Sequence, residues 1–201
     1  MKKVLIVFLL SVTAFHAHAQ NSKTITAVNI QANNSYQFSS SKSPVNSFYA
    51  LGGQVTVFLK DKIYLGFSQL NSLAPSDLLK NSELVPNKVK MFDYALNAGI
   101  KSALGEDFYL LTGIRSGIGL VSLGSDQKVD GINEFISKEK RKNYFVAPEV
   151  KVGFQIHKHF AIEAGATYKK NFGGTEKWGV SAKDFDGFGA TLSLVGSIPI
   201  K

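Results

Sequence analysis

The chain has 201 residues, a formal net charge of +8 and no cysteine. This length corresponds to a single domain, and the lack of cysteine excludes both disulfides and a lipid anchor attached through cysteine. An excess of basic over acidic side chains favours binding to polyanions. Because the export signal described next takes the chain away from nucleic acid, we expect anionic lipid headgroups or surface polysaccharide as the counter-charge instead.

The first residues have the pattern of a cleaved secretory signal. Two lysines precede an apolar run from Val4 to Phe15, and Ala17-His18-Ala19 supplies the small residues that a signal peptidase needs. The run is shorter than the ~20 residues of a helical membrane span. We therefore predict a signal peptide at 1–19 and one exported domain at 20–201. Because no later apolar run approaches a helical span, a mature domain in the membrane has to be a closed barrel.

Period-two alternation of apolar with polar or small residues predicts β-strands along the rest of the chain. In the clearest stretch, 53–70, Val55 and Val57 alternate with Gln54 and Thr56, and a polar turn leads to a second alternating arm. The predicted strands cover 24–38, the two arms of the hairpin within 53–70, 90–101, 108–121, 144–156, 160–169 and 187–200.

The connections between these strands alternate strictly in length. The short ones cover 60–62, 102–107 and 157–159, and the long ones cover 39–47, 71–88, 124–142 and 171–184. An even number of antiparallel strands with short turns at one rim and long loops at the other is typical of outer-membrane barrels. The prediction is an all-β fold: a single eight-stranded antiparallel up-and-down transmembrane β-barrel.

The composition of the strand faces predicts which face points outward. The polar faces are rich in Gly, Ser and Thr and carry few charges, of both signs, which suits a crowded lumen better than a solvated surface. The apolar face is then expected to contact lipid. A soluble lipocalin-like periplasmic binder would have the two faces inverted. Pro148 falls on the lipid face, where its missing N–H predicts a bulge.

The signal "MKK…AHAQ", the phrases "VTVFLKDKIYLGFS" and "APEVKVGFQIHKHFAIEAGATY", and the alternating connections resemble one known group. This group is the small eight-stranded outer-membrane β-barrels of the OmpA/OmpX type, and the resemblance covers the whole mature chain. It implies a monomer in the outer membrane of a Gram-negative cell, with periplasmic short turns and termini and extracellular loops. The implied role is structural or surface-interactive.

Several charges fall on the predicted lumen face. An eight-stranded barrel is just wide enough for side chains to fill it, so buried charges there have to pair. If the turn at 157–159 is centred on Lys158, Gly153 lies opposite Glu163 and Lys151 becomes the diagonal neighbour of Glu163. We predict a structural ion-pair network and no open pore; a gate, or a narrow porin-like channel for small solutes, is the alternative. The residues concerned are Asp93, Arg115, Glu149, Lys151 and Glu163.

Basic residues gather near the predicted outer rim. Their ammonium and guanidinium groups are candidates for pairing with lipopolysaccharide phosphates; the alternative is a solvated loop with snorkelling lysines. The candidates are Lys138, Lys140, Arg141, Lys142, Lys169 and Lys170. An outer aromatic girdle is also expected. Its predicted members are Tyr36, Phe38, Phe48, Tyr49, Tyr168, Phe172 and Trp178, with Phe108 and Phe160 near the inner rim.

The sequence offers little for catalysis. His157 and His159 lie two residues apart in one short turn with no acidic residue beside them, so we expect a solvated turn and no metal or cofactor. Outer-leaflet lipid-modifying enzymes place such groups at the outer rim, whereas this topology puts both histidines at the other rim. We therefore expect no enzyme activity, and an outer-leaflet lipid-modifying enzyme is a weaker alternative.

Overall fold

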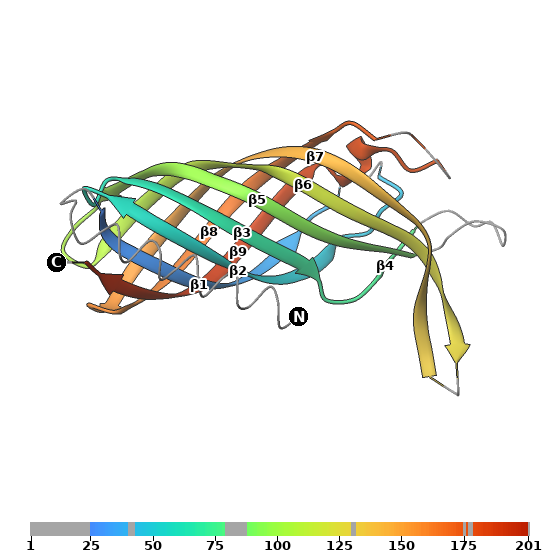
Figure 1. Ribbon diagram of the computed structural model, residues 1–201, viewed down its shortest axis with the longest axis horizontal. Helices are drawn as coiled ribbons and strands as arrows, with labels where there is room; N and C mark the ends of the chain where they lie inside the picture. The colour runs from blue at the N-terminus through green and yellow to red at the C-terminus, as the bar shows by residue number, and fades with distance from the viewer. Residues whose placement is uncertain are drawn as a thin grey trace.

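Antiparallel strands close on themselves in the computed structural model of the chain (Figure 1). β1 pairs with both β2 and β9, and β3 pairs with β5, so each barrel strand has a partner on both sides. Closure leaves no open edge along the wall, which is the condition for a sheet to cross a bilayer. The structure describes residues 25–39, 43–78, 88–129, 132–174, 176 and 179–200. The predicted signal peptide lies outside these residues.

The strands run up and down in chain order. They are β1 (Ile25–Gln37), β2 (Phe48–Leu59), β3 (Ile63–Ser72), β5 (Lys88–Ala103), β6 (Phe108–Val129), β7 (Ile132–His157), β8 (Phe160–Phe172) and β9 (Gly187–Pro199). A two-residue strand, β4 (Ser76–Asp77), pairs with the start of β5, and a 3-10 helix, η1 (Ala182–Phe185), precedes β9. No helix in the described part of the chain is long and apolar enough to span a membrane. The predicted fold class, an eight-stranded antiparallel barrel, is confirmed.

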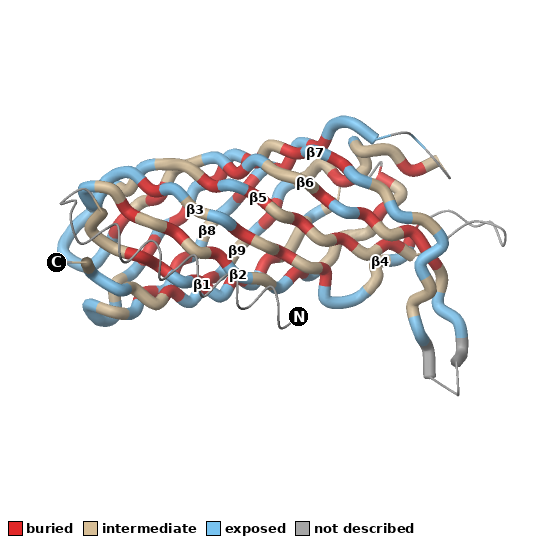
Figure 2. Tube along the Cα trace, viewed as in Figure 1, coloured by how far each residue is buried: buried red, intermediate tan, exposed pale blue. Residues whose placement is uncertain are grey.

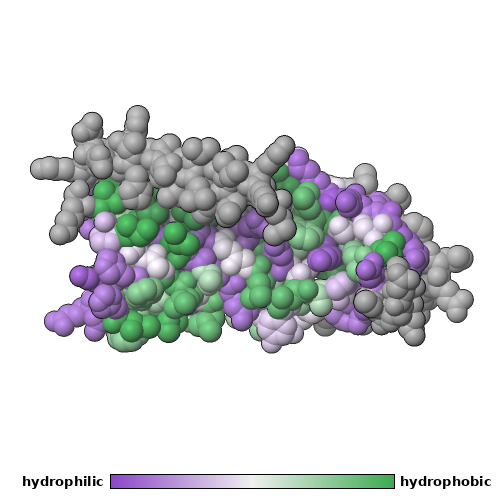
Figure 3. Space-filling model, turned by 60° about the horizontal axis from the view of Figure 1, so that its bottom comes forward, coloured by the Kyte–Doolittle hydropathy of each residue, from purple (hydrophilic) through white to green (hydrophobic). Residues whose placement is uncertain are grey.

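The faces of the strands are arranged as the alternation predicts. Gln54 and Thr56 are buried inside, while Leu96 on β5 and Leu194 on β9 are 71% and 57% exposed on the outer wall. Buried and exposed positions alternate along the barrel strands (Figure 2), and hydrophobic surface spreads along the wall between more hydrophilic ends (Figure 3). The inverted arrangement of a soluble lipocalin-like protein is therefore wrong for this chain.

The connection predicted at 124–142 is wrong, because β6 and β7 continue through it. After a bulge between Leu123 and Gly124, the two strands stay paired from Gly124↔Ser137 to Val129↔Ile132 and leave the barrel as a two-stranded ribbon (Figure 1). In the described side chains at 125–127 and 134–137, the ribbon is exposed or half-buried and buries no face in the barrel. Its sequence therefore lacks the apolar alternation that marks the other strands.

The bulge expected at Pro148 is also absent. Pro148 pairs with Ile114 of β6 in unbroken register, and the irregularity of β7 against β8 lies between Gln155 and His157. The missing N–H of Pro148 instead leaves its pairing with β8 open without a change of register, and the Thr167 hydroxyl donates a 3.0 Å hydrogen bond to the Pro148 carbonyl. This side-chain bond satisfies the Pro148 carbonyl at the point where the ladder is open.

Candidate functional site

Aromatic rings fill the lumen at the end that carries the short turns. Phe58, Tyr64 and Tyr109 form a buried apolar floor, and the Lys101 ammonium lies 4.4 Å from the centroid of the Tyr109 ring. Tyr109 faces Gly153 on the neighbouring strand, where an added Cβ would lie 2.1 Å from Tyr109 Cζ. Glycine on the lumen face therefore makes room for the ring. We did not predict this floor, although a glycine paired with an inward tyrosine is a signal for it.

Above the floor lies a layer of buried charges. Glu149 accepts a 3.3 Å hydrogen bond from the Tyr64 hydroxyl, and its carboxylate lies 3.5 Å from the Lys151 ammonium. Glu163, which is fully buried, accepts a 2.9 Å bond from the Tyr109 hydroxyl. The register Gly153↔Glu163 is the predicted one. The ion pair of Lys151, however, is with Glu149 on its own strand. Arg115 is buried on the lumen side of β6.

A second ion pair crosses the lumen nearer the outer rim. The Lys169 ammonium lies 2.5 Å from the Asp93 carboxylate, and their side chains are only 5% and 10% exposed. The same ammonium lies 4.4 Å from the centroid of the Phe145 ring. The prediction that Lys169 contacts glycolipid is wrong, because odd-numbered residues of β8 point inward and Lys169 shares the face of Glu163.

Three loops close the outer mouth of the barrel. One buried apolar cluster fills this mouth. It joins the loop residues Val45, Leu78, Val180 and Phe185 with Met91 and other inward strand residues. Loop-to-loop bonds hold this cap, among them the Val45↔Leu78 bridge. Between two loops, Ser43 Oγ donates to the Asp184 carbonyl. From the strands, Asn171 Nδ2 of β8 donates to the Phe185 carbonyl and Arg141 Nη1 of β7 donates to the Val180 carbonyl. Each of these bonds is 2.7 Å long.

Sequence reasoning missed the cap because its apolar residues are isolated within polar loops. A single Val or Phe in such a loop has no periodicity that reports burial. Between the cap and the charged layer, the structure contains a cavity of about 20 Å³ lined in part by Ser35, Gln37 and Asp93. That volume is close to what one water molecule requires. The lumen is therefore filled by a floor, a charged layer and a cap.

The basic residues predicted for the rim point in different directions. Lys140 and Lys142 lie on the outer wall, and Lys138 is exposed on the ribbon. Arg141 points to the cap, and its burial there lowers its pKa. Lys170 is outside the barrel and pairs with Asp186 at 2.5 Å.

Aromatic side chains mark both ends of the outer wall. Tyr36 and Tyr49 are in contact with ring centroids 4.6 Å apart near the loop end, as are Tyr168 and Phe188 at 4.9 Å. The prediction that Phe48 belongs to the outer girdle is wrong, because Phe48 packs against the cap. Trp178 lies outside the described residues. The remaining outward rings predicted for the girdle are Phe38, Phe172, Phe108 and Phe160.

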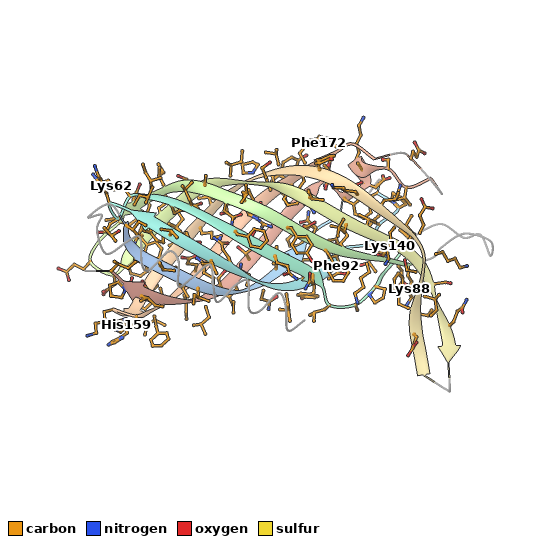
Figure 4. The ribbon with its side chains drawn as sticks, viewed as in Figure 1. Lys62, Lys88, Phe92, Lys140, His159 and Phe172 are labelled. Atoms are coloured by element: carbon orange, nitrogen blue, oxygen red, sulfur yellow. The ribbon has the colours of Figure 1, made fainter. Side chains whose placement is uncertain are left out.

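The histidines lie at the short-turn end. Figure 4 places His159 with Lys62 at this end and Phe172, Lys88 and Lys140 toward the other. The rings of His157 and His159 have centroids 5.6 Å apart, and His159 Nδ1 lies 3.0 Å from the Ser197 carbonyl. Among the residues that the structure describes, no three His, Cys, Asp or Glu side chains are close enough to hold a metal ion.

The sequence matches no family model, and no curated protein matches it. Solved structures do resemble it. The outer membrane protein OprG from Pseudomonas aeruginosa is 14% identical with a TM-score of 0.53, over 89% of this chain and 98% of that one. The N-terminal β-barrel domain of OprF from the same organism is 14% identical with a TM-score of 0.50, over 86% and 97%. Ail of Yersinia pestis, in complex with the heparin analogue sucrose octasulfate, is 15% identical with a TM-score of 0.50, over 88% and 100%.

At these identities the likeness shows the fold. The closed order of strands and the apolar outer wall agree with it. The chain therefore has the fold of the small eight-stranded outer-membrane β-barrels, as its sequence pattern predicts.

Proposed function

We propose that the protein is an outer-membrane barrel with a closed lumen, and that its role is structural or surface-interactive through its extracellular parts. The wall supports the membrane location, because large apolar side chains such as Leu96, Phe188 and Leu192 are exposed around the barrel. A soluble protein rarely leaves so much contiguous apolar surface in water. In this proposal, the short turns face the periplasm, the loops and the ribbon face the medium, and the chain is a monomer.

The filling of the lumen is the observation that carries the closed-barrel proposal. A solute crossing the barrel would have to displace the floor rings, separate the buried ion pairs and lift the cap. Each step breaks packing or leaves a charge without its partner in a desolvated interior. The ion pairs are therefore part of a structural plug in this proposal, in preference to a gate or a narrow channel.

The parts beyond the barrel mouth support a surface-interaction role. The β6–β7 ribbon projects from the wall (Figure 1). Exposed Lys138 lies at its base, and exposed Lys140 lies on the wall next to it. Such a surface suits polyanionic partners. Ail, which shares the fold, has been crystallised with a heparin analogue. By the same chemistry, polyanions are the partner class that we propose for this chain.

The position of the histidines favours a non-catalytic role over lipid modification. Chemistry on outer-leaflet lipid needs an acid or base near the outer rim. His159 lies at the opposite end of the barrel (Figure 4), His157 is in contact with it, and the chain has no cysteine to serve as a nucleophile.

The proposal is tested by solute passage through the refolded protein. The protein is reconstituted in phosphatidylcholine vesicles, its fold is checked by the mobility shift between boiled and unboiled samples, and liposome swelling with arabinose and planar-bilayer conductance are recorded. We expect both signals to stay at the level of protein-free membranes. A triple variant, Tyr64→Ala, Tyr109→Ala and Phe185→Ala, removes rings from the floor and the cap and is expected to leak. Discrete conductance steps from the unaltered protein would overturn the closed-lumen proposal.

A further inference from the structure

An ordered patch of outward side chains lies on the wall where β5, β6 and β7 approach the outer rim. The register brings three rows together, each with one residue from each strand. The uppermost row is Lys90, Ser122 and Lys140; the next is Phe92, Leu120 and Lys142; the lowest is Tyr94, Ile118 and Tyr144. Cationic groups therefore lie directly above an apolar and aromatic surface that continues into the wall.

The patch is hollowed. A groove of about 400 Å³ is lined by Phe92, Leu120 and the segments Val121–Ser122 and Lys140–Lys142. Phe92 and Lys140 lie close together in Figure 4. The Lys90 ammonium lies 5.5 Å from the centroid of the Phe92 ring. The groove thus combines an apolar floor with ammonium groups along its outer side.

The lysines of this patch differ from the other cations near the rim. Among the described residues, Lys90, Lys140 and Lys142 have no carboxylate within ion-pair distance. Lys88, by contrast, pairs with Asp126 at 2.6 Å, and that hydrogen bond raises its pKa. Lys170 is likewise occupied by Asp186. The three patch lysines are therefore available to a ligand.

We propose that this groove binds a phosphorylated glycolipid of the outer leaflet, of the lipid A type. One acyl chain lies along Phe92 and Leu120, and a phosphate is bound by Lys90, Lys140 and Lys142. The inference rests on the proposed membrane location and deepens the polyanion proposal by assigning a site and a ligand class. Charge complementarity selects an anion. The apolar floor and its continuity with the lipid-facing wall favour an anion that carries acyl chains over a soluble one.

The test compares charge removal at the two rims. The protein in detergent is mixed with diphosphoryl lipid A, and the retained lipid is counted by native mass spectrometry. The rim variant is Lys90→Gln, Lys140→Gln and Lys142→Gln. The matched control is Lys60→Gln, Lys62→Gln and Lys158→Gln, which removes three exposed lysines from the short-turn end. We expect the rim variant to bind on the order of a hundredfold more weakly, because each lysine near an anionic headgroup contributes about a factor of five. The control is expected to bind normally.

Two further arms identify the ligand. Phe92→Ala, with all lysines kept, is expected to weaken lipid A binding several-fold, and 10 mM inorganic phosphate is expected not to displace the lipid. Equal losses in the rim variant and the control, or displacement by phosphate or by a polyglutamate peptide, would overturn the site. Each variant is first checked for its mobility shift on boiling. If the rim variant still shows the mobility shift on boiling and binds lipid A as well as the unaltered protein does, this inference alone is refuted. If the unaltered protein is found in the soluble fraction and shows no mobility shift, the proposed function is refuted.

Discussion

The ion pair between Asp93 and Lys169 is the sharpest test of a desolvated lumen. The two groups are 2.5 Å apart, and their side chains are 10% and 5% exposed. At an effective dielectric constant of 20, two unit charges at that distance attract by about 7 kcal/mol. Most of this offsets the desolvation of both ions. Removing one partner leaves the other charge buried and uncompensated, which typically costs about 3–5 kcal/mol.

We therefore expect Asp93→Asn to lower the free energy of unfolding by about 3–5 kcal/mol, because the buried Lys169 ammonium loses its carboxylate partner and keeps the Phe145 ring beside it. The double variant Asp93→Asn with Lys169→Met buries no charge at this place. It is expected to recover most of the loss, with a coupling energy of about 2 kcal/mol or more. The assay is urea unfolding in lipid vesicles at pH 7, followed by far-UV circular dichroism.

The neighbouring lysine provides a matched control. Lys170 is also paired at 2.5 Å, with Asp186, but its side chain is 55% exposed outside the barrel. Solvent screens such a pair, so Lys170→Met is expected to leave the unfolding midpoint unchanged. If Asp93→Asn also left the midpoint unchanged, or if the double variant were no more stable than Asp93→Asn, the argument for a desolvated plug would be refuted.

Three further predictions concern the floor, its glycine and the wall. Tyr109→Phe removes the 2.9 Å bond to buried Glu163 and is expected to lower the free energy of unfolding by about 1–3 kcal/mol in the same urea assay. Gly153→Ala places a Cβ 2.1 Å from Tyr109 Cζ and should lower the free energy of unfolding by about 1–3 kcal/mol through overpacking. The double variant Gly153→Ala with Tyr109→Leu should regain this stability. If it does not, the clash with Tyr109 is not the cause. Leu96→Arg, near the middle of the lipid-facing wall, should lower the free energy of unfolding in vesicles by about 2–4 kcal/mol. Leu104→Arg in the short turn should lower it by about 0–1 kcal/mol. Equal decreases in the two variants would contradict the membrane assignment.

The sequence by itself determined the barrel wall. Side chains alternate with a period of two on every strand, so an apolar face has to point one way and a polar face the other. From this alone the number of strands, their up-and-down order and the inward direction of Asp93, Arg115 and Glu163 follow, and the structure agrees on each. Short turns also fixed local register, as in the pairing of Gly153 with Glu163.

Only the tertiary structure decided what meets inside and above that wall. Lys169 and Asp93 are 76 residues apart and become partners because closure of the barrel brings β8 across from β5. The cap depends on isolated apolar residues from three loops, and the ribbon on backbone pairing that needs no apolar pattern. Periodicity reports the environment of a strand's two faces, whereas contacts across a lumen or between loops depend on how distant segments are brought together.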